Sequence, residues 1–316
     1  MTIEADRVAQ TPDLSYKFSE QIDVSTGLPV GLVPLEIVRR KSYLNNIRPN
    51  AIYHDIGGGT GASARYILSM IPADVKEGMR VIISEPYNYI PHTVRQEIVK
   101  EVDELVIIKS AAVSSAGLIE ADVSSLINMV HLIPKGDRVE MWKRLFDASP
   151  IGSVGIVSTT FITDWIPEEL HANRVAYFFQ AWMMQIARRA KEVLSDEVFA
   201  EFRARKKTEK LSLLDSNGLI QEIIGAGFEI EHKSNETMPC NVESYDLIRY
   251  DKEWIDFITP VIEPAQACEI QGYALQKTMK EKDLTLEDRM PRNTLVLVFR
   301  KPGIPKNYVY GSTLVV

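Results

Sequence analysis

The sequence predicts an α/β protein built on a doubly wound, mostly parallel sheet. Short apolar segments alternate along the chain with amphipathic helical segments, which is typical of repeated β-α-β units. The apolar segments are continuous, as in Val81-Ile82-Ile83, and parallel strands covered on both faces have this character. A hydrophobic content of 45% and a charged content of 25% over 316 residues supply enough apolar side chains for a sizeable core.

The first half of the chain supplies most of the expected sheet. Residues 1–50 are expected to form an arm or cap, with a helix beginning near Pro34 and continuing to about Ile47. Strands are then expected at 51–56, 80–85, 105–109, 124–130 and 154–161, and helices at 61–70, 91–102 and 137–149. Residues 51–316 would form the main domain around these strands.

Two helical insertions interrupt this pattern in the second half. The first insertion, at about 164–210, is expected to form two long helices. It is rich in large apolar side chains between Tyr177 and Met184. Such a helix packs in a core, at a dimer interface or as a lid over an apolar ligand. The second insertion, at about 241–285, is expected to be mostly helical. The sheet pattern returns outside the insertions, with a helix at 213–224 and strands at 228–233 and 293–299.

Charge and cysteine content exclude several classes of protein. With 36 basic and 43 acidic residues the formal net charge is −7, which argues against a broad basic surface for nucleic acid or an anionic membrane. Two cysteines, Cys240 and Cys268, are too few for a disulfide framework and lack the spacing of a metal site. Because of this spacing we expect no bound metal. We find neither a signal-type leader nor an 18-residue apolar run, so we expect a soluble cytoplasmic protein.

The strongest local signal is a glycine-rich turn directly after the first expected strand. It reads Asp55-Ile56-Gly57-Gly58-Gly59-Thr60-Gly61 and precedes an expected helix. Glycines permit a tight turn and let a ligand approach the bare backbone, while the turn aims free amide N–H groups at the ligand. The same segment also satisfies the G-x-G-x-x-A pattern of dinucleotide sites, so an NAD-linked oxidoreductase stays open on this motif alone.

The form D-x-G-x-G-x-G, with the acid inside the motif, resembles motif I of class I S-adenosylmethionine (AdoMet)-dependent methyltransferases. This resemblance implies a seven-stranded, Rossmann-like methyltransferase fold and AdoMet as the cofactor. It also implies that the backbone of Gly57, Gly58 and Gly59 approaches the methionine part of AdoMet, and that Asp55 helps to position its ammonium group. An acid at this position would repel a pyrophosphate, which disfavours the dinucleotide interpretation.

Further cofactor contacts are implied after the second, third and fourth strands. Glu85 ends the second expected strand, where a carboxylate can accept two hydrogen bonds from ribose hydroxyls. The segment 122–134 is similar to the family's fourth strand and the loop beside the sulfonium, which assigns Asn128 to the cofactor. The family commonly places an acid after the third strand, whereas this chain has Ser110 and Ala111 there, so adenine would meet backbone or the Ser110 hydroxyl.

Methyl transfer from a sulfonium is an in-line displacement that needs alignment, and it needs a base only if the acceptor must lose a proton. His131 is the candidate catalytic base because it follows the fourth strand at the edge where ligands gather. A histidine held for structural reasons is the alternative, and His54 and His171 are weaker candidates. Tyr16 and Phe18 in the N-terminal arm could close over the cofactor or simply pack on the sheet.

The resemblance implies methyl transfer to a small, apolar or aromatic metabolite at an oxygen, carbon or nitrogen atom. The expected partner is thus a small-molecule acceptor, with no nucleic acid and no membrane, and a homodimer is a further possibility. Besides the NAD-linked oxidoreductase, two alternatives stay open at this point. One is an AdoMet-binding enzyme with other chemistry, of cyclase or decarboxylase type, and the other is a non-catalytic protein that retains the fold.

Overall fold

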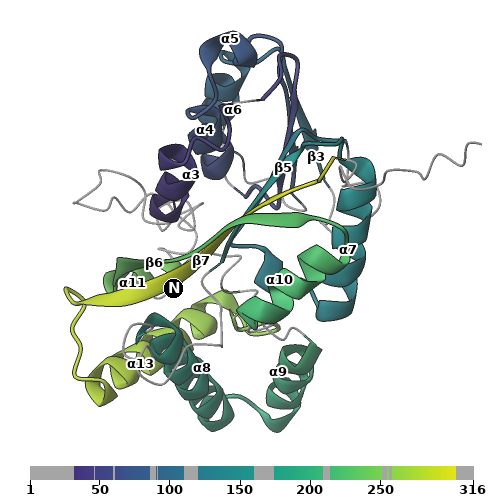
Figure 1. Cartoon of the computed structure of the whole chain (residues 1–316). Helices are drawn as coiled ribbons and strands as arrows, with labels where there is room; N and C mark the ends of the chain where they lie inside the picture. The colour runs from purple at the N-terminus through teal and green to yellow at the C-terminus, as the bar shows by residue number, and fades with distance from the viewer. Residues whose placement is uncertain are drawn as a thin grey trace, which may run out of the picture. The chain divides into compact units, whose positions relative to one another are not determined.

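The computed structural model of the chain describes two compact units (Figure 1). The described residues are 32–45, 47–59, 61–85, 90, 92–109, 120–159, 174–208, 214–250, 255 and 258–303. The sheet unit contains Ile37–Ser158, Asp215–Ser234 and the chain from Val296. The helical unit contains Thr159–Leu214 and Asn235–Leu295, together with the chain up to Glu36.

Seven strands form one sheet in the order β3-β2-β1-β4-β5-β7-β6. The strands are β1 (Ile52–Ile56), β2 (Arg80–Ser84), β3 (Glu104–Ile108), β4 (Val123–Ile127), β5 (Val154–Thr159), β6 (Glu229–Asn241) and β7 (Arg289–Arg300). Strands β1 to β5 pair in parallel, and the order reverses between β1 and β4. The carboxyl ends of β1 and β4 therefore meet at the switch point where ligands of open α/β sheets bind. The predicted doubly wound, mostly parallel seven-stranded fold is confirmed.

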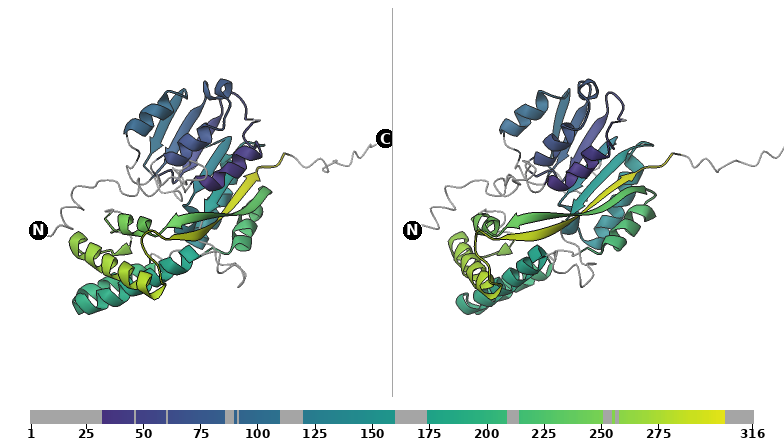
Figure 2. Two further views of the ribbon diagram at one scale, coloured as in Figure 1. Left: turned by 90° about the vertical axis from the view of Figure 1, so that its left-hand side faces the viewer. Right: turned by 60° about the vertical axis from the view of Figure 1, so that its left-hand side comes forward.

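Strand β7 is antiparallel to both of its neighbours, β5 and β6. The amide of Gly152 donates to the carbonyl of Lys301, and the amide of Lys301 donates to the carbonyl of Ser153, just before β5 begins. Towards β6, Arg300 forms an ion pair with Glu231, whereas at the other end of the two strands the amide of Val242 donates to the carbonyl of Asp288. Residue numbers thus rise along β6 as they fall along β7, and Figure 2 shows the two strands as a long antiparallel pair.

Helices cover both faces of the sheet unit. They are α3 (Glu36–Arg40), α4 (Ala62–Leu68), α5 (Ala73–Lys76), α6 (His92–Val99), α7 (Lys135–Ala148), α10 (Ser216–Gly225) and the 3-10 turn η3 (Val130–Leu132). Helix α4 packs with α6, and α7 packs with α10 (Figure 1). Because helices cover the sheet, strand residues such as Ile82, Leu126 and Ile156 are buried. This burial explains the continuous apolar runs in the sequence.

Three aromatic rings and one glycine lock β7 into the sheet unit. The Phe299 ring lies edge-on to Trp142 of α7 and to Phe228, at centroid distances of 5.8 and 4.7 Å. Gly155 of β5 lies directly beneath it, and a Cβ atom there would come within 2.0 Å of the Phe299 ring. The ring occupies the space that a side chain at position 155 would need, so this strand position requires glycine.

The helical unit has its own apolar core. Its helices are α8 (Arg174–Val193), α9 (Asp196–Thr208), α11 (Glu243–Ile248) and α13 (Pro264–Glu281). Helices α8 and α13 pack together, and Trp182 donates its indole N–H to the carbonyl of Gln271 at 3.0 Å. The rings of Phe178, Phe179, Trp182 and Tyr245 form an aromatic cluster in this core. No helix among the described residues combines the length and apolar character needed to cross a bilayer.

Several elements differ from the sequence prediction, among them β7, which begins at Arg289 instead of about Asn293. The helix expected up to about Ile47 is a 3-10 turn, η1 (Val33–Leu35), followed by the short α3, because Ser42 has a left-handed backbone with φ +55°. A short helix, α5, occupies the expected loop at 72–78. Strand β6 continues to Asn241 rather than ending near Lys233. The second half of β6 is polar and shows no apolar pattern in the sequence. Its pairing with β7 stabilises it as a strand instead.

Gly155→Ala should lower the free energy of unfolding by about 2 kcal/mol, because the added methyl group overpacks against a ring that cannot move freely. Urea denaturation measures this change. Gly136→Ala, in the first turn of α7, is the matched control, since a Cβ atom added there would meet no described atom within 4 Å. It should leave stability unchanged or slightly higher. Equal stabilities of the two variants would contradict the packing described for Phe299.

Candidate cofactor-binding site

The glycine-rich turn after β1 adopts a backbone that favours glycine. Gly57, Gly59 and Gly61 have φ angles of +71°, +51° and +79°, in the left-handed region. The amides of Gly57 and Gly58 both donate to the carbonyl of Ser84, at 2.8 and 3.3 Å. These bonds hold the turn against the end of β2, so the ends of the two neighbouring strands form one site.

The glycines of the turn serve two different purposes. A Cβ atom at Gly58 would lie 2.5 Å from the Ile83 side chain, and one at Gly57 would lie 3.0 Å from Met129. Both positions therefore need glycine for internal packing. A Cβ atom at Gly59 would meet no atom of the described residues within 4 Å. Gly59 thus combines a left-handed backbone with open space above it, which permits close approach by a ligand.

Asp55 is completely buried beneath this turn. Its carboxylate accepts hydrogen bonds from the Ser63 hydroxyl at 2.8 Å, from the Ser125 hydroxyl and from the amide of Ala64. The Ser125 hydroxyl also lies 2.8 Å from the Tyr53 hydroxyl. Burial raises the pKa of Asp55 to about 6, although the hydroxyl and amide donors pull in the other direction. These contacts tie β1 to α4 and β4, so Asp55 braces the turn; its contact with an ammonium group stays a prediction.

Glu85 lies beside the turn, at the end of β2. Its side chain is buried, and its Oε2 atom accepts a hydrogen bond from the amide of Gly59 at 2.8 Å. The structure therefore brings together Gly59 and Glu85, which follow different strands in the sequence. The expectation that the turn aims free amide groups at a ligand is wrong for Gly57, Gly58 and Gly59, because their amides already donate to Ser84 and Glu85. A carboxylate beside an open glycine backbone can serve hydroxyl donors of a ligand.

The segment after β4 carries two further predicted residues. Asn128 has a left-handed backbone with φ +53°, and its amide donates to the carbonyl of Ser158 at 2.7 Å. Its Oδ1 atom is buried and accepts no hydrogen bond from any described residue. An unsatisfied buried oxygen is costly, so this atom is suited to accept from a ligand. His131 follows in η3 and is buried, while the next residue after Asn128, Met129, packs on Gly57.

The remaining predicted residues divide into two groups. His54 is buried within the sheet, where its Nε2 atom lies 2.7 Å from the Ser84 hydroxyl, a contact that fits a structural role. The other predicted site residues lie outside the described residues: Ser110, Ala111, His171, Tyr16 and Phe18.

Sequence reasoning missed Ser63, Ser125 and Met129. Ser125 stands opposite Asp55 in the β1–β4 register, and a polar residue inside an apolar strand was the signal available for it. Ser63 and Met129 carried no such signal, because their roles arise from which atoms the turn brings near them.

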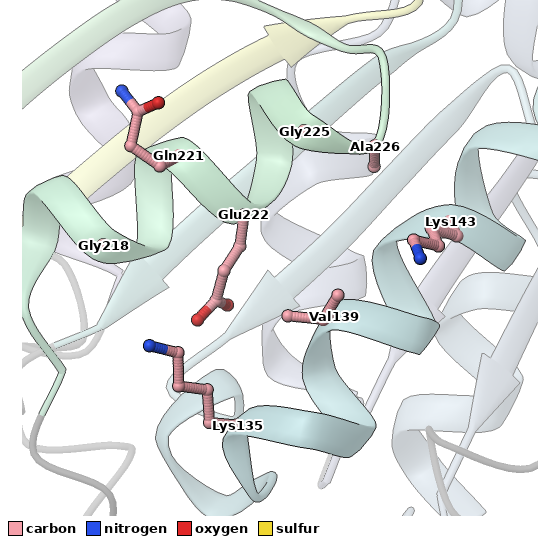
Figure 3. A pocket seen from close by; sticks show the side chains of 8 residues that line it. All are labelled: Lys135, Val139, Lys143, Gly218, Gln221, Glu222, Gly225 and Ala226. Atoms are coloured by element: carbon pink, nitrogen blue, oxygen red, sulfur yellow. The ribbon is translucent and has the colours of Figure 1, made fainter.

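A separate depression of about 340 Å³ lies between α7 and α10 (Figure 3). It is lined by Lys135, Val139, Lys143, Gly218, Gln221, Glu222, Gly225 and Ala226. None of the predicted site residues is among them, so the depression is distinct from the glycine turn. Among the residues that the structure describes, no group of three or more His, Cys, Asp or Glu side chains could hold a metal ion.

The fold is similar to solved methyltransferases. Loganic acid methyltransferase, solved with S-adenosylhomocysteine (SAH), matches with a TM-score of 0.60 at 13% identity, over 87% of this chain and 92% of that chain. A provisionally assigned methyltransferase from Bacillus halodurans C-125 matches with a TM-score of 0.50 at 11% identity, over 84% of this chain and 99% of that chain. No protein-family model and no curated protein matches the sequence.

At these identities the similarity concerns the fold. The chain has the fold of the class I AdoMet-dependent methyltransferases, as the motif I resemblance implied.

The raised pKa of Asp55 predicts how stability depends on pH. Because burial lifts this pKa from 3.8 to about 6, the folded protein binds an extra proton between these pH values. The free energy of unfolding should therefore fall as pH rises through this interval, by about 2–3 kcal/mol from this carboxyl group. In Asp55→Asn this loss should be absent.

Urea denaturation at pH 4 and pH 7 measures the difference between the two proteins. Asp74→Asn, an exposed change on α5, is the control and should keep the wild-type pH dependence. A wild-type-like pH dependence in Asp55→Asn would show that burial does not raise the pKa of Asp55 in the folded protein.

Proposed function

We propose that this protein is an AdoMet-dependent methyltransferase that acts on a small, apolar or aromatic metabolite, at an oxygen, carbon or nitrogen atom. The observation that carries the proposal is the glycine turn itself. It is braced from below by Asp55 and joined to Glu85 through the amide of Gly59, within a class I methyltransferase fold. A purely structural turn would not need an open left-handed backbone beside a buried carboxylate.

The site residues fit AdoMet in charge and hydrogen-bonding capacity. The amides of Gly57, Gly58 and Gly59 already donate within the protein, so the methionine part would approach the turn at the open space by Gly59. Glu85 would accept hydrogen bonds from the ribose hydroxyls. The unsatisfied Oδ1 atom of Asn128 offers an acceptor to a donor of the cofactor. The similar loganic acid methyltransferase was solved with SAH, which is AdoMet without the transferred methyl group and the positive charge on sulfur.

The residues of this chain would act mainly by alignment. Bound AdoMet supplies a methyl group activated by the positive charge of its sulfur, so the protein needs to hold the acceptor in line with it. His131 is buried on η3, after β4, where water has little access. If the acceptor is a hydroxyl group, His131 would take its proton, and a carbon or nitrogen acceptor that is already nucleophilic would need no base.

The proposed acceptor class rests on the family resemblance. Helix α8 of the helical unit, taken by itself, carries two exposed large side chains. Tyr177 and Met184 are 44% and 57% exposed, although both are large and apolar. They stand seven positions apart and therefore share one helix face. Aromatic and methionine side chains form an adaptable surface for an apolar or aromatic molecule.

Isothermal titration calorimetry with AdoMet, SAH and NAD tests the proposed cofactor. Micromolar binding of the two adenosyl compounds, without NAD binding, is the expected result. Binding of NAD alone, or of none of the three, would reject the proposal. Mass spectrometry of products then separates methylation, which adds one methylene equivalent to an acceptor, from other AdoMet chemistry.

Glu85→Ala should weaken SAH binding by about 1–3 kcal/mol, because the variant loses hydrogen bonds to a charged acceptor. Calorimetry measures the dissociation constant, and circular dichroism checks that the variant is folded. Glu104→Ala is the control, since Glu104 begins β3 and its exposed carboxylate pairs with Arg80. The assignment of Glu85 fails if the folded variant binds SAH as tightly as wild type does.

Gly59→Ala should raise the dissociation constant of SAH about tenfold, because the added methyl group enters the open space above the turn. Gly152→Ala is a matched control with a φ of +84°, where an added Cβ atom would also meet no described atom within 4 Å. Both substitutions place alanine in a left-handed conformation and should cost similar stability, about 1 kcal/mol. Only Gly59→Ala should affect binding, and equal SAH affinities of the two variants would contradict a ligand at the turn.

A further inference from the structure

A buried ion pair joins α7 to α10 in the sheet unit. Arg138 donates from Nε to Glu222 Oε2 at 2.7 Å and from Nη2 to Glu222 Oε1 at 2.9 Å. The two side chains are only 4% and 7% exposed. Figure 3 shows Glu222 reaching from α10 towards the first turns of α7, between Lys135 and Val139. The two parallel bonds fix the plane of the guanidinium group as well as its position.

The guanidinium group has a third partner outside the pair. Its Nη1 atom donates to the carbonyl of Ile133 at 3.0 Å. Ile133 ends the segment 128–133, which begins with Asn128 and contains His131. At the other end of this segment, the amide of Asn128 bonds to the carbonyl of Ser158. Arg138 thus anchors the far end of the segment that carries two candidate site residues.

The segment also contacts the glycine turn directly. The Met129 side chain would lie 3.0 Å from a Cβ atom at Gly57, so the segment and the turn pack without spare room. A shift of the segment would therefore move Met129 against the turn and displace the buried Oδ1 atom of Asn128. The position of the segment matters for the site as a whole.

We propose that Arg138 and Glu222 are positioning residues, which hold segment 128–133 in the arrangement that the cofactor site requires. This proposal rests on the proposed function for the identity of the ligand. Glu222 orients the guanidinium group, and Arg138 fixes the segment through the carbonyl of Ile133. Replacing a buried ion pair with apolar residues of similar volume is often neutral for stability, so a role in positioning can be separated from one in folding.

The test is the double variant Arg138→Met with Glu222→Leu. It removes both charges together and leaves no uncompensated buried charge. The matched control is Arg144→Met with Glu140→Leu. That pair lies on the same helix, with its side chains 39% and 52% exposed and with Arg144 Nε 3.0 Å from Glu140 Oε1. Both double variants receive the same substitutions, so any difference between them comes from the position of the ion pair, which is buried in one case and exposed in the other.

Two readouts apply to both variants and to wild type. Hydrogen exchange followed by mass spectrometry should show about tenfold faster exchange in 128–133 for the buried-pair variant, because its anchor is lost. Calorimetry should show a dissociation constant for SAH raised by a similar factor. The control should match wild type in both. The proposal is overturned if the folded buried-pair variant exchanges and binds as wild type does, or if the control changes equally.

A second variant covers the case in which the double variant fails to fold. Arg138→Lys keeps the buried positive charge but cannot form two parallel bonds and the bond to Ile133 together. It should give the same faster exchange in 128–133 while its urea midpoint stays near that of wild type, and unchanged exchange would overturn the proposal. If wild type itself does not bind SAH, the proposed function fails, whereas the exchange comparison still decides whether the pair positions the segment.

Discussion

The site depends on one buried carboxyl group. Asp55 lies where β1 ends, and its hydrogen bonds reach Ser63 of α4 and Ser125 of β4. Burying a carboxyl group is costly, and this cost is reduced only because several donors converge on it. The chain therefore cannot place Asp55 without also fixing α4 and β4. Since the glycine turn connects β1 to α4, its shape follows from the same bonds.

A second buried polar cluster in the sheet unit fixes positions in the same way. Arg138 and Glu222 are also buried charges with more hydrogen bonds than a simple pair requires. Buried ion pairs add little net stability compared with apolar residues, but they tolerate few alternative geometries. Each polar cluster holds one of the two segments that would contact the cofactor. The Asp55 cluster holds the turn after β1, and the Arg138 cluster holds the segment after β4. The apolar core supplies stability, whereas these clusters define positions.

Much of the fold could be predicted because the central strands are covered on both faces. Apolar runs reveal β2 and β5, and the glycine motif places the site at the end of β1. Strands β1 and β4 carry polar residues such as Asp55 and Ser125 between their apolar ones. The outer half of β6 gave no such signal, since its order comes from pairing with β7 rather than from burial. The partners of Asp55 and Arg138 were also hidden from the sequence. Arg138 and Glu222 are separated by 84 positions, and only the packing of α7 on α10 brings them together.

The place of β7 between β5 and β6 has a consequence for synthesis on the ribosome. Of the seven strands that the structure describes, this one leaves the ribosome last, yet it fills a position inside the sheet. Until it emerges, β5 ends the sheet with an open edge, and β6 lacks its neighbour. Open edges invite pairing with other chains, so the nascent protein passes through an interval in which it is prone to misassembly. Insertion of β7, with Phe299 seated on Gly155, closes that interval.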